Sequence, residues 1–490
     1  MLELANYING KHVPAASRKV LPIIEPATGL QYSTVPDSDA VDVDQAVAAA
    51  KTAFPAWSAI SSHQRSQHLL RLADLIDANV DALARAESID TGKPLSLARS
   101  IDIPRSAANF RFFATAILHT ASELHDFDGG GIPGGVPAIN YTLRKPRGVA
   151  GLISPWNLPL YLLSWKIAPA LATGNAVVCK PSEVTPVTAS MLGDLASQAG
   201  IPAGVLNVVH GTGGSAGAAL VQHDDVPAIS FTGSTRVGQW IGEHCGARSK
   251  RTSLELGGKN PFIVFADADL PKALETAVRA GFTNQGQVCL CGSRLLLHES
   301  IAAEFLKEFV ARVAALRIGD PLEPSTQQGA LTSEAHFHKV VSMVDQAREL
   351  GGRVLCGGSP LAKSDLPTRC KSGFFFRPTV IEGLSPSCVV EQEEIFGPVV
   401  TVQTFSTDEQ AIALANCTRY GLAATLFTQN LSRAHALASQ LDAGIVWVNC
   451  WMVRDLRTPF GGVKQSGVGR EGGLEALKFF TEPKNVCISV

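Results

Sequence analysis

Two cysteines, Cys289 and Cys291, are the residues best suited to covalent chemistry, and they lie one residue apart in the stretch FTNQGQVCLCGSR. The glycines of this stretch let one backbone segment approach another closely. A free cysteine is usually a small core hydrophobe. The Cys-x-Cys spacing could also indicate a metal, but no second pair of Cys or His residues follows at zinc-site spacing. We therefore predict no metal site, and the choice between a core thiol and a nucleophile rests on the rest of the chain.

Four further motifs accompany the two thiols. They are ISPWNLPL from residue 153, SLELGGKNP from residue 253, EEIFGPV from residue 393 and TPFGGVKQSGVGRE from residue 458. In this order they resemble the aldehyde dehydrogenase superfamily, and the resemblance extends from about Tyr7 to Val490. It favours a nucleophilic cysteine over a core thiol.

Oxidation of an aldehyde to an acid needs a nucleophile, an oxyanion donor, a hydride acceptor and a base that brings water onto the acyl-enzyme. Cysteine suits the first role because a thiolate is a strong nucleophile and a workable leaving group. The resemblance implies that Cys289, the second residue after Gly-Gln, is the nucleophile and that Cys291 is a neighbour. It also implies that the Asn157 amide and the Cys289 N–H hold the oxyanion. Glu255 would activate water, aided by burial that raises its pKa. A strand-end or helix-capping role is the alternative for Glu255. Lys166 is left outside the chemistry.

A nucleotide site is expected at one of two glycine-rich loops. The loop from Gly211 to Gly217 nearly matches G-x-G-x-x-G but has one residue too many, and such a loop is often only a turn. The better candidate is the stretch FTGSTRVG with Gly233 and Ser234, which follows a predicted strand. Backbone amides and a hydroxyl at the start of a helix can bind a pyrophosphate, and the resemblance also favours these two residues.

Lys180 and Glu183, in CKPSE after another predicted strand, resemble the family's adenosine-ribose ligands. A carboxylate there accepts hydrogen bonds from ribose hydroxyls and repels a 2′-phosphate, which favours NAD over NADP. A solvated strand end is the alternative. The resemblance places Glu394 at the nicotinamide ribose, with Phe396 packed near it, and the remaining expected cofactor residues are Ile153 and Trp156.

Part of the sequence bears on the substrate. The strings DIPRSAANFRFFA, CLCGSR, NCWMVRDLRTPFGG and GREGG resemble the branch that contains 2-aminomuconate and 2-hydroxymuconate semialdehyde dehydrogenases. Such a substrate carries a carboxylate far from its aldehyde, and arginine forks suit carboxylates. The resemblance implies Arg111 and Arg454 as anchors, with Arg457 as a nearby substitute. Structural ion pairs with Asp102 or Asp455 are the alternative.

The expected reaction is therefore NAD-dependent oxidation of an unsaturated, carboxylate-bearing semialdehyde formed in aromatic catabolism, such as the tryptophan–kynurenine route. We expect 2-aminomuconate 6-semialdehyde as substrate; 2-hydroxymuconate semialdehyde, retinal and a broad range of aldehydes remain alternatives. A CoA-acylating enzyme is disfavoured because Glu255 is retained, and a thiol hydrolase is disfavoured by the cofactor-site matches. A silent binding protein on the same fold is disfavoured by the intact Cys289, Glu255 and Asn157.

The elements that position these residues are predicted by alternating patterns. Short β-rich runs alternate with helical patterns from residue 148 to 257, and again from 259 to about 441, which implies parallel sheets with right-handed crossovers. We predict an α/β fold with a Rossmann-like NAD-binding domain (1–122 and 146–257), a second α/β catalytic domain (258–441) and a small β oligomerisation region (123–145 and 470–490). Residues 1–40 are expected to be an extended arm laid over a domain.

Composition limits the other possibilities. The chain has 490 residues, 46% of them hydrophobic, and a formal net charge of −2 with both signs interspersed. This length predicts more than one domain, and the absence of a basic face disfavours nucleic acid. The start of the sequence does not resemble a signal peptide, and no apolar run is long enough for a membrane span. Ten scattered cysteines fit reduced thiols in the cytoplasm, and a homodimer or homotetramer is expected.

Overall fold

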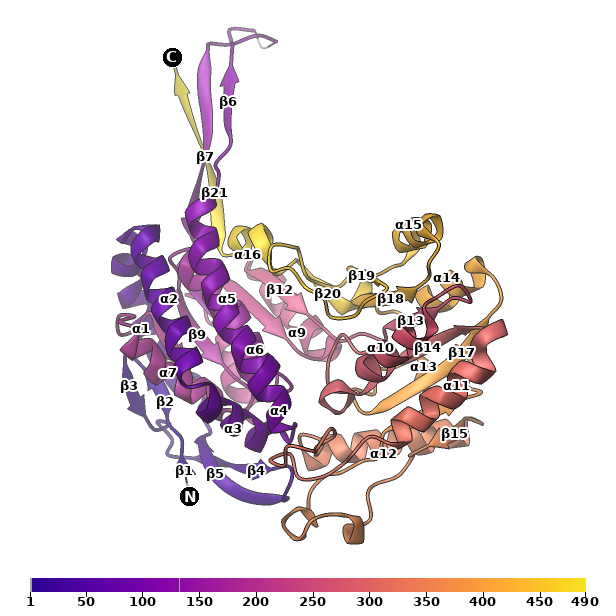
Figure 1. The fold of residues 1–490 in the computed structure, drawn as a ribbon. Coiled ribbons are helices and arrows are strands. Elements are labelled where there is room, and N and C mark those ends of the chain that lie inside the picture. Colours follow the sequence, from indigo (N-terminus) through magenta and orange to yellow (C-terminus); the bar gives the residue numbers. More distant parts are fainter. Residues whose placement is uncertain (1, 132) are drawn as a thin grey trace.

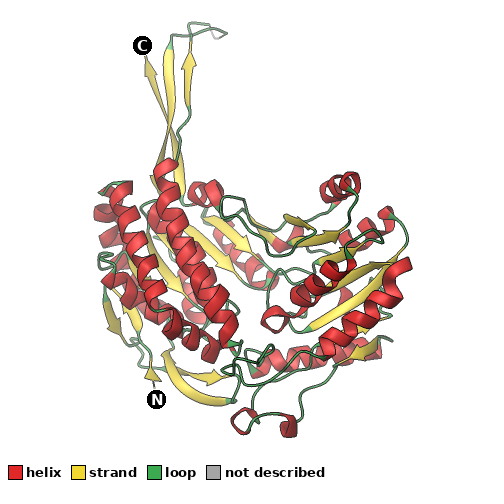
Figure 2. Cartoon of the chain, viewed as in Figure 1, coloured by secondary structure: helices red, strands yellow, loops and turns green. Residues whose placement is uncertain are grey.

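Two large sheets organise the chain, and a thin three-stranded sheet projects from the first half (Figures 1 and 2). The structure, a computed structural model, describes residues 2–131 and 133–490. The α/β fold predicted from the alternating pattern is confirmed, since the central strands of both large sheets are parallel.

The first large sheet has eight strands. Its central strands are buried on both faces, as their nearly continuous apolar sequences predict. Helices α6, α7 and α9 make the crossovers between parallel strands. The strand order is β20 (Gly467–Val468), β12 (Arg251–Glu255), β11 (Ala228–Thr232), β8 (Val149–Ile153), β9 (Ala176–Lys180), β10 (Leu206–Val208), β2 (Asn6–Ile8) and β3 (Lys11–Val13), and the crossover helices are α6 (Pro159–Ala172), α7 (Val187–Gln198) and α9 (Thr235–Gly246).

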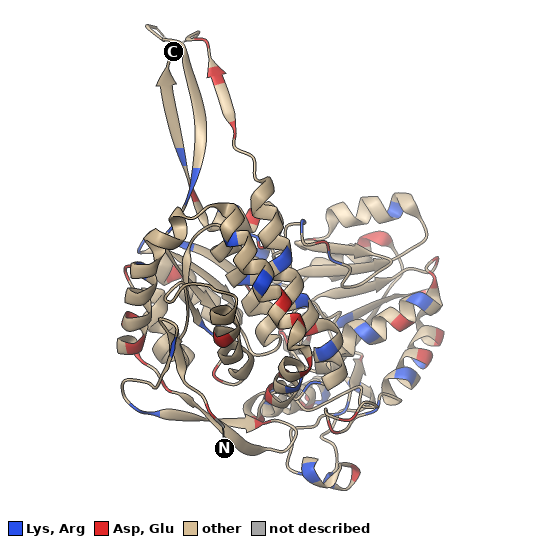
Figure 3. Ribbon diagram, turned by 60° about the vertical axis from the view of Figure 1, so that its left-hand side comes forward, with Lys and Arg blue, Asp and Glu red and all other residues tan. Residues whose placement is uncertain are grey.

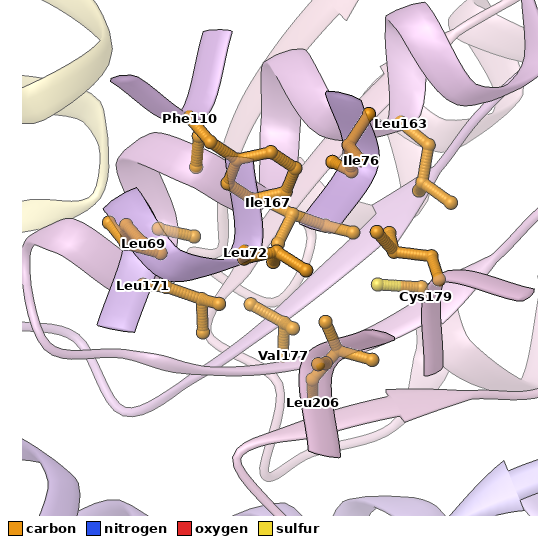
Figure 4. Packing of buried hydrophobic residues seen from close by; sticks show 14 of the residues in the cluster. Leu69, Leu72, Ile76, Phe110, Leu163, Ile167, Leu171, Val177, Cys179 and Leu206 are labelled. Carbon is orange, nitrogen blue, oxygen red and sulfur yellow. The ribbon is translucent and has the colours of Figure 1, made fainter. Parts of the chain in front are cut away.

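A layer of helices covers this sheet and contains its largest apolar core. Leu72, Phe110 and Ile167, from three different helices, are all fully buried there (Figure 4). Phe110 and Phe113 are both 0% exposed. The other helices of this half are α1 (Ala40–Ala59), α2 (Ser62–Ala78), α3 (Val80–Thr91), α4 (Leu95–Leu97), α5 (Ile103–Ala116), α8 (Ala218–Gln222) and α16 (Gly473–Phe479).

The second large sheet has seven strands, of which only the edge strand β15 runs antiparallel to its neighbour. It extends to β19, a few residues past the expected limit at residue 441. The order is β15 (Arg353–Cys356), β16 (Thr379–Glu382), β17 (Val399–Phe405), β14 (Arg294–His298), β13 (Pro261–Val264), β18 (Ala423–Phe427) and β19 (Ile445–Val448), packed with α10 (Leu270–Phe282), α11 (Glu299–Ala314), α12 (Glu334–Glu349), α13 (Val389–Gln392), α14 (Asp408–Asn416) and α15 (Leu431–Gln440).

The projecting sheet joins segments far apart in the sequence. Strand β7 (Ala138–Pro146) pairs with β6 (Leu124–Phe127) on one side and with the C-terminal β21 (Thr481–Ser489) on the other, all antiparallel. Figure 1 shows it standing clear of both large sheets. Both segments of the predicted small β region, 123–145 and 470–490, contribute strands to this sheet.

The N-terminal segment differs from the prediction of an arm outside the core. Strand β2 pairs with β10 and continues the eight-stranded sheet, and the Asn6 side chain is fully buried. Asn6 Oδ1 accepts a hydrogen bond of 2.8 Å from the His210 backbone N–H. Other parts of residues 2–40 form a separate small sheet, which has the order β1 (Leu2–Glu3), β5 (Leu30–Pro36) and β4 (Val20–Glu25).

Charged residues of both signs are mixed along the helices of both halves (Figure 3). Within the described residues, no helix combines the length and apolar character needed to cross a membrane. The same residues contain no group of three or more His, Cys, Asp or Glu side chains arranged to hold a metal ion.

Candidate active site

The loop that carries the two thiols has an unusual backbone. After α10 ends at Phe282, Asn284, Gln285 and Gly286 adopt φ values of 54°, 55° and 69° in succession. These left-handed conformations are costly for residues with side chains. A Cβ on Gly286 would lie 2.1 Å from the Gly397 carbonyl oxygen, so only glycine fits. The loop is therefore held in one shape against the segment that follows Phe396.

The structure separates the roles of the two thiols. Cys289 is half-buried and lines two cavities. Cys291 is 5% exposed and packs in the apolar core of the second half, where burial raises its pKa to about 12. The Asn260 amide donates to the carbonyl oxygens of both cysteines, at 2.7 and 2.9 Å, and fixes the turn between them. Cys291 is thus the core thiol and Cys289 is the accessible one.

The pKa of Cys289 is raised, first by burial and then by the carboxylates of Glu394 and Glu255, while Arg454 opposes the shift. A reactive cysteine needs an electropositive or amide-rich setting that lowers this pKa. The chain by itself does not supply it. The thiol is therefore neutral in the protein alone near neutral pH, and its ionisation requires a base or a cation beside it.

Asn157 lies between β8 and α6 and is 3% exposed. Its side-chain Nδ2 donates to the Gln287 carbonyl oxygen at 2.9 Å, and the Asn284 amide donates to the Asn157 carbonyl oxygen at 3.1 Å. An amide nitrogen carries two hydrogens, so one fixes the side chain while the second remains to face the cavity that Asn157 shares with Cys289.

Glu255, at the end of β12, is 3% exposed, and neither carboxylate oxygen has a hydrogen-bond partner among the described residues. Burial raises its pKa well above the ordinary value, and the nearby Glu471 raises it further. Lys166, which opposes this shift, donates to Glu471 Oε1 at 2.7 Å and to Ser230 Oγ at 3.0 Å. A buried carboxyl with a raised pKa is suited to general-base work. Sequence reasoning left Lys166 out and missed Glu471.

The first cavity beside Cys289 lies at the carboxyl ends of the first sheet's strands, where open α/β sheets bind ligands. Ser234 begins α9, and its hydroxyl caps the Val237 N–H at 3.4 Å. Lys180 ends β9 and forms a 2.8 Å ion pair with Glu183. The lining includes Trp156, Asn157, Gly233, Ser234, Glu394 and Phe396, and Ile153 ends β8 close by in the sequence.

Glu394 reaches into this cavity from the second half. Its carboxylate accepts the Gly258 N–H at 3.0 Å, and a Cβ on Gly257 would lie 2.0 Å from Glu394 Oε2, so the glycine pair makes room for the side chain. Burial raises the pKa of Glu394 to about 7.

Two side chains of helix α12 form hydrogen bonds with the backbone of the segment that carries Glu394 and Phe396. Lys339 Nζ donates to the Glu394 carbonyl oxygen at 2.9 Å, and His336 Nε2 donates to the Phe396 carbonyl oxygen at 2.7 Å. Phe396 has a left-handed φ of 62°, and its ring meets Trp156 edge-on at 5.2 Å. Sequence reasoning missed His336 and Lys339, which lie about 60 residues from their partners.

The second cavity beside Cys289 is lined mostly by apolar groups. Its polar lining residues are Tyr161, Thr232, Arg454 and the two carboxylates of Glu255 and Glu471. The Arg454 guanidinium lies 4.0 Å from the Phe460 ring centroid, and its Nη1 donates to the Tyr161 hydroxyl at 3.3 Å. No ion pair involves Arg454 among the described residues. A cation with only aromatic and hydroxyl partners can receive an anion.

Arg105, which sequence reasoning missed, faces the same aromatic group. Its guanidinium lies 5.5 Å from the Tyr161 ring and 5.8 Å from the Trp165 ring, and Arg454 lies 5.0 Å from Trp165. Arg105 Nε and Nη2 are buried and have no partner among the described residues. Burial lowers the pKa of Arg105, and Arg454 adds to the effect. Two cations thus lie on one aromatic platform without a carboxylate between them.

The structure does not bring Arg111, a predicted substrate anchor, to either cavity. Arg111 forms ion pairs with Asp74 at 2.6 Å and Asp77 at 2.5 Å on α2, and 40% of its side chain is exposed. Arg111 therefore makes structural ion pairs, but its partners are not Asp102 or Asp455, which the sequence suggested. Arg457 also proves structural, because it pairs with Asp455 and is 81% exposed.

A half-buried thiol thus lines two cavities of a two-sheet α/β fold. The chain belongs to the aldehyde dehydrogenase family, whose model matches residues 12–486. The 2-aminomuconic semialdehyde dehydrogenase of Danio rerio is 51% identical over 487 residues (99% of this chain, 98% of that protein). The 2-hydroxymuconic semialdehyde dehydrogenase of Pseudomonas sp. (strain CF600) is 48% identical over 492 residues (100% of both).

Solved structures are also similar to this chain. The crystal structure of PnpE from Pseudomonas sp. WBC-3 superimposes with a TM-score of 0.95 at 45% identity, covering 100% of this chain and 98% of that chain. PnpE in complex with nicotinamide adenine dinucleotide also matches with a TM-score of 0.95, covering 99% and 98%.

Proposed function

We propose that this protein oxidises a carboxylate-bearing semialdehyde to the corresponding dicarboxylic acid, with NAD as oxidant and Cys289 as the covalent nucleophile. The observation that carries the proposal is the position of Cys289 between two cavities. One is lined by five of the eight expected cofactor residues, Trp156, Gly233, Ser234, Glu394 and Phe396, and the other is lined by Glu255 and Arg454. A single thiol can therefore meet a substrate from one side and a cofactor from the other.

The chain's residues fit NAD. Ser234 and the start of α9 suit a pyrophosphate, and the Glu183 carboxylate, paired with Lys180, suits ribose hydroxyls and opposes a 2′-phosphate. Glu394, reached through the space left by Gly257, suits the second ribose. The complex of PnpE with nicotinamide adenine dinucleotide supports this choice. Bound NAD would supply a hydride acceptor and a positive charge.

The reaction on the protein side has two halves. The Cys289 thiol loses its proton to solvent, and Sγ then bonds to the aldehyde carbon. The free N–H of Asn157 and the Cys289 N–H stabilise the oxyanion; one such donor typically contributes about 10²–10³ in rate. Loss of hydride from the adduct leaves a thioester. Glu255 then takes a proton from water, water adds to the thioester carbon, and collapse of the adduct breaks the carbon–sulfur bond, which frees the acid and the Cys289 thiolate.

The substrate is most consistent with 2-aminomuconate 6-semialdehyde. Arg454 and Arg105 replace the pair that the sequence suggested: both lie on the Tyr161–Trp165 platform without a carboxylate partner among the described residues. A terminal substrate carboxylate would pair with both. 2-Hydroxymuconate semialdehyde has the same carboxylate and is the second candidate, as the Pseudomonas relative indicates. Retinal offers these cations no partner.

The test is NADH formation from purified protein, NAD and each semialdehyde without CoA. We expect one NADH per acid formed, and no turnover by C289S. Equal turnover by C289S refutes the nucleophile, and a dependence on CoA refutes hydrolysis through Glu255.

We also propose that the chain forms a homodimer or homotetramer through the projecting sheet and works in the cytoplasm. Leu124 and Ile488 are 63% and 50% exposed on this sheet, and β6 and β21 each leave an edge unpaired within the chain. All ten cysteines, which lie within the described residues, are free. Sedimentation of the wild type and of I488D should show an oligomer that the charge weakens; a wild-type monomer refutes the assembly.

A further inference from the structure

A buried lysine lies directly behind Asn157, outside both cavities. Lys93 follows α3 after Gly92, which ends the helix with φ = 77°, and its side chain is 0% exposed. Its Nζ donates to Asp102 Oδ2 at 2.5 Å, to Glu87 Oε1 at 3.4 Å and to the Asn157 carbonyl oxygen at 2.9 Å. The three donors of the ammonium are thus all used.

The cluster fixes the Asn157 backbone from several sides. The Asn157 carbonyl oxygen accepts from Lys93 and from the Asn284 amide, while Glu87 Oε2 accepts the Leu160 N–H at 3.4 Å. The Asn157 side chain is meanwhile bound to the Gln287 carbonyl oxygen. The segment from 157 to 160 is therefore held between a buried cation on one side and the nucleophile loop on the other.

Burying three charges costs desolvation energy, and an ion pair is a weak reason for stability by itself. Here Asp102 and Glu87 outweigh the effect of burial on Lys93 and raise its pKa, so it stays charged. A charge retained at such a cost against the carbonyl oxygen of the oxyanion-binding residue suggests a role in the reaction.

We propose that Lys93 is a positioning residue, which with Asp102 holds the Asn157 peptide so that the free amide N–H points at the oxyanion formed on Cys289. The inference rests on the proposed function, because it gives Asn157 that role. Lys93 itself touches neither cavity. The expected effect of its loss is on kcat, with little effect on the KM for NAD.

The test combines variants of Lys93 with N157A. K93M leaves two buried carboxylates without a cation, so two further variants provide folded alternatives. K93M/D102N removes one of these charges, and D102N keeps an acceptor of the same shape. The matched control is K51M, because Lys51 is 63% exposed and pairs only with Asp225 at the surface. Tm and NAD binding by fluorescence establish that each variant folds.

We expect kcat to fall about 10- to 100-fold in K93M/D102N and several-fold in D102N, part of what one oxyanion donor contributes, with K51M unchanged. In the N157A background the same changes should cost almost nothing further, because their effect passes through Asn157. Unchanged kcat in the folded variants, or losses that multiply with that of N157A, would overturn the proposal. If N157A alone keeps wild-type kcat, the oxyanion role within the proposed function fails instead.

Discussion

The anchoring of the substrate carboxylate by two arginines yields the sharpest prediction, tested by R454M and R105M. Methionine keeps much of the packing on Tyr161 and Trp165 but removes the charge. Each guanidinium would make a charge-assisted hydrogen bond in a partly buried site, worth roughly 1.5–3 kcal/mol. Since about 1.4 kcal/mol is tenfold, kcat/KM for the semialdehyde should fall about 10- to 150-fold in each variant.

The assay is NADH production from the semialdehyde and, in parallel, from an uncharged aldehyde of similar length. Turnover of the uncharged aldehyde should survive, because Cys289 and Asn157 are untouched. Because both cations would bind one carboxylate, the double variant should lose less than the product of the single losses.

The control is R111M. Arg111 lies on α5, as Arg105 does, but it pairs with Asp74 and Asp77 on the surface. The variant should keep wild-type kcat/KM on both aldehydes. Equal losses on the charged and uncharged aldehydes in R454M and R105M would refute the anchoring argument, and a selective loss in R111M would show that the wrong arginine was chosen.

Three further predictions concern the carboxylates. E255Q should lower kcat by about 10²–10⁴ and leave a rapid burst of NADH equal to the enzyme concentration in stopped flow; a lost burst would mean that Glu255 acts before the thioester forms. The ionised form of Glu394 is the one that accepts ribose hydrogen bonds, and the pKa of Glu394 is raised to about 7. The KM for NAD should therefore fall as pH rises through 7. If the same pH dependence persists in E394Q, it belongs to another group. E183Q should raise the ratio of kcat/KM for NADP to that for NAD about tenfold, since it removes one charge repulsion; an unchanged ratio in steady-state kinetics argues against that role.

Much of the architecture could be predicted from local patterns, because buried parallel strands and amphipathic helices leave clear periodicities. The β2 strand was misjudged because three residues carry little periodicity and its partner, β10, lies some 200 residues away. Contacts of that range are not visible in local composition.

The arginine error has a simple geometric origin. Arg105 and Arg111 lie in one motif, but at 3.6 residues per turn a separation of six residues places them on different sides of α5. One therefore faces Tyr161 and the other faces α2. Lys166 was left out of the chemistry, and Glu471 was missed, for a different reason: their pairing spans 305 residues and exists only in the folded chain.

The central claim is that Cys289, and not Cys291, carries the acyl group. The most direct measurement is mass spectrometry of E255Q quenched in acid during turnover, with fragmentation of the peptide that contains both thiols. We predict one added acyl group per chain, located on Cys289 and absent from C289S. An adduct on Cys291, or steady turnover with no adduct on either sulfur, would contradict the account.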